Sequence, residues 1–192
     1  MRLARVAVGA LVGVAVLAGC SSGPAPANDT LPSAAPTSAE ASETLTPLGP
    51  PDFPMPPEAR EQTPAGVDAF VRYYLELVNR TSEQMDPQYL RALSDGCETC
   101  NRIALDAEQD AALGYSYQGG AITIRSAAPA TVRPPIGELA FVADQAALSV
   151  VDAQGVPVEG LQFSAIPDLS SGARARWDAD RSSWILTELT LG

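Results

Sequence analysis

Two cysteines separated by two residues are the part of the chain best suited to chemistry. Cys97-Glu98-Thr99-Cys100 holds two thiols within one helical turn of each other. This spacing suits three kinds of chemistry: a structural disulfide, a redox dithiol that attacks other disulfides, or half of a tetrahedral zinc site. The only other cysteine, Cys20, lies far upstream, so the choice concerns Cys97 and Cys100 alone.

The surrounding sequence favours a disulfide between Cys97 and Cys100. The chain has no His and no second cysteine pair, which leaves a zinc site incomplete. Redox dithiols of the thioredoxin type follow the first strand of a βαβ unit, whereas only helical patterns precede Cys97. Closing a loop this short contributes about 2 kcal/mol, which suits a local staple at a helix start. Thiol–disulfide exchange is the alternative.

The first 20 residues have the organisation of an export signal. Two arginines precede an apolar run from Val6 to Ala18, which is too short to span a bilayer and suits a signal-peptide core. Leu17-Ala18-Gly19-Cys20 is similar to the lipobox of bacterial lipoproteins, in which the cysteine is acylated and the chain is cut before it. The similarity implies a signal peptide over residues 1–19 and a lipid anchor on Cys20. The protein is then expected at the extracytoplasmic face of the cell membrane, where oxidising conditions favour a disulfide.

A proline-rich stretch follows the predicted anchor. Eleven of the 17 prolines fall between Pro24 and Pro64, and most other residues there are Ala, Ser and Thr. Such a composition offers little to bury, so residues 20–63 are predicted to be the lipid anchor and a disordered tether. Residues 64–192 carry the periodic patterns and are expected to form one domain.

The charge balance excludes some partners. The formal net charge is −11, and removal of residues 1–19 with their two arginines takes it to −13. So acidic a chain is poorly suited to nucleic acid, whose phosphates need basic partners. The lack of His removes the usual general base and the commonest metal ligand. We therefore expect that the protein binds no nucleic acid, no metal and no cofactor.

Three helices are predicted in the first half of the domain. Thr63-Pro64 has the pattern of an N-cap followed by proline, and apolar residues then recur at helical spacing at Val67, Phe70, Val71, Tyr74, Leu75 and Val78. Asp86-Pro87 repeats the cap pattern before a short helix. Residues 97–113 form the third helix, which ends at Gly114, with an inward face at Ile103, Ala104, Ala107 and Ala111.

Strand patterns fill the second half. The predicted strands lie within residues 115–117, 121–125, 138–152 and 161–165. Asp144-Gln145-Ala146 indicates either a bulge in one long strand or a turn between two. Ser170-Ser171-Gly172 predicts a break. The chain then ends with a hairpin over residues 173–189 that places Trp177 and Trp184 on either side of its loop.

Helices followed by antiparallel strands indicate an α+β fold in which N-terminal helices pack on a curved, cone-like antiparallel sheet. This order and the terminal Trp hairpin resemble the ketosteroid-isomerase-like (nuclear-transport-factor-like) cone superfamily. The resemblance implies an alternative function, a small-pocket enzyme with a buried carboxylate base. Asp144 and Glu188 are the candidates because each interrupts a strand pattern.

A narrower resemblance covers most of the mature chain. The lipobox, the tether, the first helix with Tyr73-Tyr74, and Leu93-Ser94-Asp95 before Cys97 and Cys100 resemble an uncharacterised family of actinobacterial lipoproteins with a domain of unknown function. The resemblance implies the location and the disulfide, and it carries no activity. The function expected from the sequence is therefore a non-enzymatic binding or assembly module. Its partner is predicted to be a hydrophobic small molecule or a cell-envelope protein.

Overall fold

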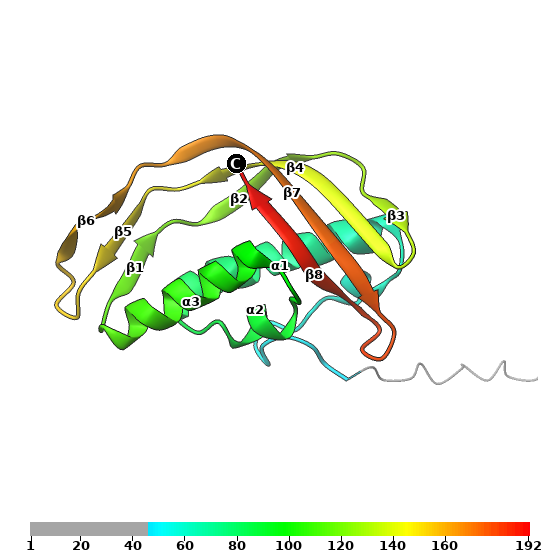
Figure 1. Ribbon diagram of the computed structural model, residues 1–192, viewed down its shortest axis with the longest axis horizontal. Coiled ribbons are helices and arrows are strands. Elements are labelled where there is room, and N and C mark those ends of the chain that lie inside the picture. The colour runs from blue at the N-terminus through cyan, green and yellow to red at the C-terminus, as the bar shows by residue number, and fades with distance from the viewer. Residues whose placement is uncertain (1–45) are drawn as a thin grey trace, which may run out of the picture. The chain divides into compact units, whose positions relative to one another are not determined.

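The computed structural model describes residues 46–192. The predicted lipidation site Cys20, the signal peptide over residues 1–19 and most of the tether lie outside the described residues. The helices are η1, a short 3-10 helix over Pro57–Arg60, and the α-helices α1 (Pro64–Gln84), α2 (Gln88–Ala92) and α3 (Glu98–Ala112) (Figure 1). None of the helices within residues 46–192 is both long and apolar enough to cross a membrane.

Eight strands follow the helices. They are β1 (Ser116–Gly119), β2 (Ile122–Ala127), β3 (Thr131–Arg133), β4 (Ile136–Gln145), β5 (Leu148–Val151), β6 (Pro157–Phe163), β7 (Ile166–Asp178) and β8 (Ser183–Leu191). All pairings between them are antiparallel, in a five-stranded sheet ordered β2-β4-β7-β8 with β3 beside β4, and a three-stranded sheet ordered β1-β5-β6. The predicted α+β class, with helices on antiparallel sheet, is confirmed.

The two sheets form one arch, because three strands pass from one sheet to the other (Figure 1). β1 leads into β2, β4 into β5 and β6 into β7, each across two residues. The bend is fixed between Gly119-Gly120 and Ala147: the Gly120 amide donates to the Ala147 carbonyl at 2.9 Å. Gly119 has φ +80° and a Cβ there would collide with the same carbonyl, so this bend requires glycine.

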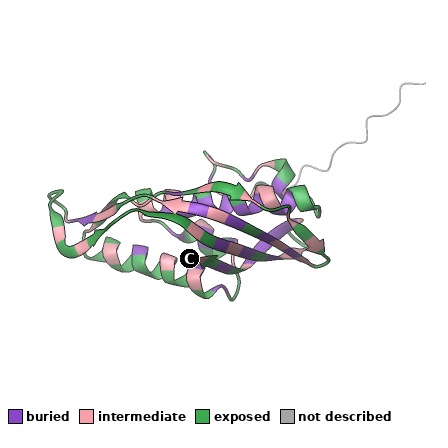
Figure 2. Cartoon of the chain, turned by 90° about the horizontal axis from the view of Figure 1, so that it is seen from above, coloured by how far each residue is buried: buried purple, intermediate pink, exposed green. Residues whose placement is uncertain are grey.

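The core lies between the five-stranded sheet and α1. All six residues of the predicted apolar face of α1 are buried. Thr63 caps the helix as predicted, since its hydroxyl accepts the Gly66 amide at 3.0 Å. Buried positions gather under the five-stranded sheet, whereas most residues of β1 and β6 remain exposed (Figure 2). The arch therefore has one well-packed half and one half with little packed beneath it.

The packed domain begins before residue 64, the start expected from the sequence. Met55 and Ala59 are buried, and Leu48 and Phe53 pack against the same core. Phe53 stacks on Tyr73 with ring centroids 5.1 Å apart, and the Tyr73 hydroxyl donates to the Phe53 carbonyl at 3.0 Å. Residues 46–63 thus pack on the domain instead of extending the tether, because the few apolar residues among the prolines find partners in α1 and β8.

Three local predictions differ from the structure. The break predicted at Ser170-Ser171-Gly172 is wrong: β7 runs through it, paired with β4 on one side and, from Ser171, with β8 on the other. Ala111 is exposed, because α3 extends beyond the core at that end. Asp86 accepts the Gln88 amide at 3.1 Å, but α2 begins only at Gln88. Of the two alternatives at Asp144-Gln145-Ala146, the structure has two separate strands: β4 ends at Gln145, and β5 starts at Leu148 beyond the bend.

Candidate functional site

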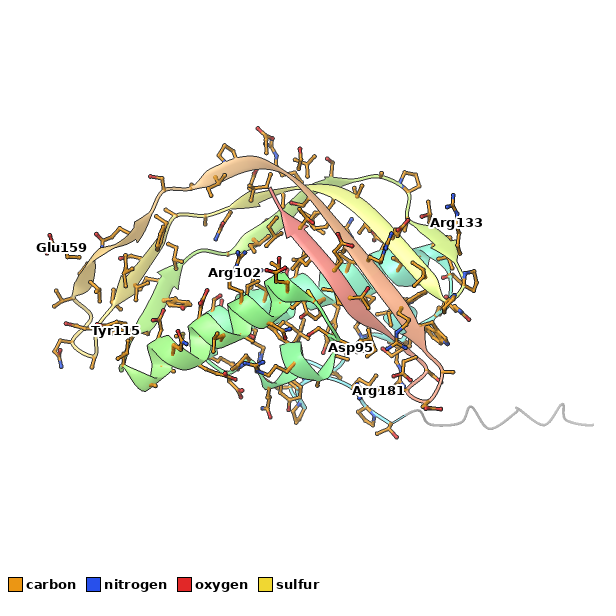
Figure 3. The ribbon with its side chains drawn as sticks, in the orientation of Figure 1. Asp95, Arg102, Tyr115, Arg133, Glu159 and Arg181 are labelled. Atoms are coloured by element: carbon orange, nitrogen blue, oxygen red, sulfur yellow. A yellow bond between two sulfur atoms is a disulfide. The ribbon has the colours of Figure 1, made fainter. Side chains whose placement is uncertain are left out.

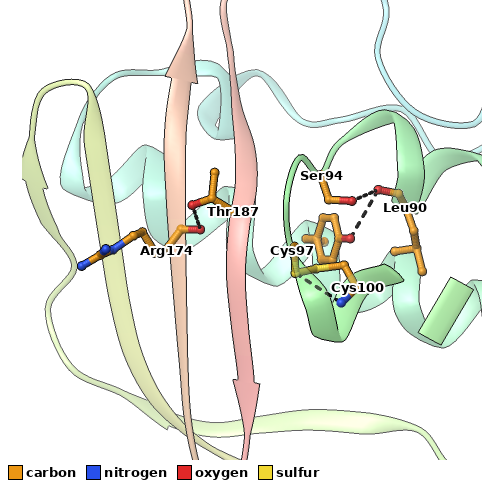
Figure 4. Close-up of a disulfide and its surroundings, with 7 residues drawn as sticks. Leu90, Ser94, Cys97, Cys100, Arg174 and Thr187 are labelled. Atoms are coloured by element: carbon orange, nitrogen blue, oxygen red, sulfur yellow. Dashed lines mark hydrogen bonds between the residues drawn. A yellow bond between two sulfur atoms is a disulfide. The ribbon is translucent and has the colours of Figure 1, made fainter. Parts of the chain in front are cut away.

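The predicted cysteine pair is a disulfide at the start of α3. The sulfurs of Cys97 and Cys100 are 1.98 Å apart, and both residues are 1% exposed. Cys97 is the N-cap of α3, and its Sγ accepts the Cys100 amide at 3.2 Å (Figure 4). A covalent link and a cap therefore fix the same helical turn. Because both sulfurs are buried, an attacking thiolate has no access to them.

The residues before the disulfide cover the outer edge of β8. The Leu186 amide donates to the Leu93 carbonyl, and the Asp95 amide donates to the Leu186 carbonyl, both at 2.9 Å. Ser94 holds this segment through its hydroxyl, which donates to the Leu90 carbonyl at 2.8 Å, and the Tyr74 hydroxyl donates to the same oxygen at 3.3 Å (Figure 4). The Leu93-to-Cys100 motif thus supports the fold.

The hollow of the molecule is a pocket of about 470 Å³ under the bend of the arch. We call it the arch pocket. It lies between α3, the end of α1, the end of β4 and the strands β1, β2, β5, β6, β7 and β8, and it is open to solvent. Its apolar lining includes Val78, Ile103, Ala107, Ile122, Leu148, Val150, Leu161, Phe163, Ile166 and Leu191. A site of this size and composition suits a small apolar or amphipathic molecule.

Large apolar side chains remain exposed at the mouth of the arch pocket. Phe163 is 51% and Ile166 is 46% exposed, and both belong to the lining. They flank the turn from β6 to β7, where β8 has already ended at Leu191. Asn79 positions the opposite wall: its side chain donates to the Ile122 carbonyl at 3.0 Å and accepts the Ile122 amide at 2.8 Å. Exposed apolar side chains that lie together in a hollow indicate a binding surface more often than isolated exposed apolar side chains do.

Charged groups of α3 lie along one side of the arch pocket. Arg102, Asp106 and Asp110 follow one another at intervals of four residues and all line it. Figure 3 shows Arg102 on α3 beneath the arch. The Tyr117 hydroxyl donates to Asp110 Oδ2 at 2.6 Å. Burial, the hydrogen bond to Asp110 and the charges of Asp110 and Asp106 all raise the pKa of Tyr117, so the hydroxyl keeps its proton and holds that carboxylate in place.

The two candidate carboxylates of the cone-enzyme hypothesis lie elsewhere. The Asp144 side chain is 40% exposed, lies 3.5 Å from the Arg125 guanidinium and accepts the Asp168 amide at 2.9 Å. Glu188 is exposed on β8. Neither carboxylate points into an apolar cavity, because both strands turn these positions to the outer face. Within residues 46–192 no three His, Cys, Asp or Glu side chains are grouped to hold a metal ion.

Sequence reasoning missed the arch pocket although two signals bear on it. Arg102, Asp106 and Asp110 recur at the four-residue spacing of an ordinary solvated helix face, which does not distinguish them as site residues. Gly119-Gly120 has the composition of a simple turn between strands. Only the bend that this glycine pair permits carries β5 and β6 over the charged side of α3.

No family model matches the chain, and no curated protein matches it. A crystal structure of the intermembrane space region of the chloroplast protein ARC6 is similar, with a TM-score of 0.49 and 15% identity, over 67% of this chain and 95% of that one.

Proposed function

We propose that the protein is a lipid-anchored extracytoplasmic lipoprotein whose domain binds an apolar or amphipathic small molecule without transforming it. The observation that carries the binding role is the arch pocket, with apolar side chains over about half of its lining and two exposed apolar side chains at its mouth. Its volume of about 470 Å³ lies within the range of small-molecule sites, roughly 300–1,000 Å³.

A protein partner on the sheet is less well supported. The outer face carries ion pairs, including Arg174 with Glu138 at 2.7 Å and Arg125 with Asp168 at 2.8 Å. The free edge along β6 and the start of β7 contains Pro157 and Pro167, which cannot donate a ladder hydrogen bond. A charged face and an interrupted edge are features that prevent association.

The two catalytic alternatives have less support as well. A cone enzyme needs a carboxylate made basic by burial, and Asp144 and Glu188 lie at the surface. A thiol–disulfide exchanger needs an accessible sulfur, and Cys97 and Cys100 are buried. We therefore retain the non-enzymatic role and assign the disulfide to the fold.

The location and the family rest on the sequence. The lipobox ending at Cys20 supports a lipid anchor, and the motif from Leu93 to Cys100 supports membership in the actinobacterial lipoprotein family. Replacement of Cys20 by Ala in the producing bacterium is expected to abolish labelling with palmitate and to release the protein from the membrane fraction. Membrane retention of the unlabelled C20A protein would contradict the anchor.

Binding is tested with an uncharged naphthylamine dye whose fluorescence rises in apolar surroundings. We expect the dye to bind the mature chain and to be displaced by a monoacylglycerol. Phe163→Asp places a charge at the mouth and should weaken dye binding by about tenfold or more. Val156→Asp is the matched control, because Val156 is 57% exposed and lies outside the lining. Equal loss in both variants, or no binding by the parent chain, would overturn the proposal.

A further inference from the structure

We propose that the ligand of the arch pocket is a zwitterionic amphiphile: an apolar tail whose head carries an anionic group next to an ammonium group. This inference rests on the proposed binding function. It comes from the sign, order and pairing of the charges that line the pocket.

Arg102 and Asp106 have opposite charges but do not neutralise each other. They lie four residues apart on α3, which corresponds to a rise of about 6 Å along the helix. Both are exposed at the pocket. Among the ion pairs closer than 4 Å within residues 46–192, none includes either of them. The two charges are therefore both available to a ligand.

The order of the two residues disfavours a pair between them. In α1 the acidic residue comes first, and Asp68 pairs with Arg72 at 2.8 Å. In α3 the basic residue comes first, which is the less favourable orientation for a pair four residues apart on a helix. The same spacing thus gives a closed ion pair on α1 and an open one on α3.

The remaining charges of the arch pocket fix the polarity of the head group. Arg102 is the only basic residue in the lining, so it is the contact for a phosphate or carboxylate. Asp106 and Asp110 follow toward the outer end of α3, and Tyr117 holds Asp110 by a hydrogen bond. These carboxylates suit an ammonium group. A head with only one sign of charge would meet a charge of its own sign at one end.

The apolar part of the pocket takes the tail. Ile103 and Ala107 lie on the same helix as the charged side chains, one position further along the chain than Arg102 and Asp106, and they line the floor. Leu148, Leu161 and Phe163 face them from β5 and β6. Charges at an open rim above an apolar floor match a molecule with a polar head and an apolar tail.

The test compares three probes with the same myristoyl chain as competitors of the naphthylamine dye. They are zwitterionic lysophosphatidylethanolamine, anionic lysophosphatidylglycerol and uncharged monoacylglycerol, each used as monomers on the mature chain. We expect the zwitterionic probe to bind more tightly than the other two by roughly three- to tenfold. Arg102→Gln and Asp106→Asn should each remove most of this preference, measured as the ratio of the affinity for the zwitterionic probe to the affinity for monoacylglycerol in the same variant.

Two exposed charges outside the arch pocket provide matched controls. Arg133→Gln and Asp180→Asn change the net charge equally, and neither residue is part of the lining. Both should keep the parent preference. If all three probes bind equally to the parent chain, or if the control variants lose the preference as well, the head-group inference is wrong while the binding function stands. If no probe displaces the dye and the dye itself does not bind, both fail.

Discussion

The indole Nε1 of Trp184 donates a hydrogen bond to the Glu61 carbonyl oxygen at 2.9 Å. Trp184 is wholly buried on the last strand, and Glu61 belongs to the segment that precedes α1. The contact joins parts of the chain 123 residues apart. The segment before α1 is therefore packed against the core and contributes to the stability of the fold.

A chain that starts at residue 64 should be much less stable than one that starts at residue 46. The shorter chain loses the buried side chains of Met55 and Ala59 and leaves the Trp184 N–H without its acceptor. Together these losses should cost about 3 kcal/mol or more. Denaturant unfolding of the two purified chains measures the difference. Equal midpoints and slopes would show that residues 46–63 contribute nothing.

Loss of the disulfide should destabilise the protein moderately. Cys97→Ala with Cys100→Ala removes the cross-link, worth about 2 kcal/mol for a loop this short, and the cap on the Cys100 amide, worth about 1 kcal/mol. Guanidinium unfolding should therefore show a decrease of about 3 kcal/mol in the free energy of unfolding. Reduction of the parent protein should reproduce the cross-link part only. Dye binding should persist under native conditions, and its disappearance in a folded double mutant would tie the disulfide to the site.

A methyl group at Gly137 should disturb the core. A Cβ at this position of β4 would collide with Val67 and press on the Trp184 ring, both wholly buried. We expect Gly137→Ala to lower the free energy of unfolding by about 1–3 kcal/mol. Gly172→Ala is the control on the neighbouring strand, where a Cβ meets only the Leu139 carbonyl at 3.7 Å. Thermal unfolding of both variants tests the difference, and equal melting temperatures would contradict the packing argument.

Tyr74 should make the protein sensitive to alkaline pH. Burial raises the pKa of Tyr74 from 10.0 to about 12. The folded state then holds the proton more tightly than the unfolded state. The stability that this tighter proton binding at Tyr74 gives the folded state is complete below pH 10 and is lost as the pH rises from 10 to about 12. Tyr74→Phe should remove up to about 1.4 kcal/mol per pH unit from the slope of unfolding free energy in this window. An unchanged slope would show that another group controls alkaline unfolding.

The sequence predicts elements best where local pattern and packing agree. The helix from Pro64 is such a case, since its cap, its proline and its apolar face all indicate the same structure. Ser170-Ser171-Gly172 shows the opposite. These small polar residues favour a turn locally, but β7 lies between β4 and β8, and the two ladders of hydrogen bonds outweigh the local preference.

The arch pocket could not be predicted from periodicity. Phe163 is part of an alternating strand pattern, which indicates two faces but not what lies opposite each. Arg102 and Asp106 have the spacing of an ordinary solvated helix. They line a common hollow only because Gly119 allows the strands to bend there and pass over α3, and such a bend depends on contacts between distant parts of the chain.

The backbone is irregular along the edge formed by β6 and the start of β7. Gly160 and Asp168 adopt positive φ in the same segment that holds Pro157 and Pro167, and this edge cannot present a regular row of backbone donors and acceptors. β8 continues the same side of the arch beyond the start of β7, and its outer edge is covered at Leu186 by the segment from Leu93 to Asp95. If many copies are confined to a membrane plane, as the proposed anchor implies, neighbouring domains meet often and in a restricted set of orientations. This edge then offers no regular template for strand-to-strand pairing between neighbouring copies, so dense display on a surface does not by itself extend the sheet from this side.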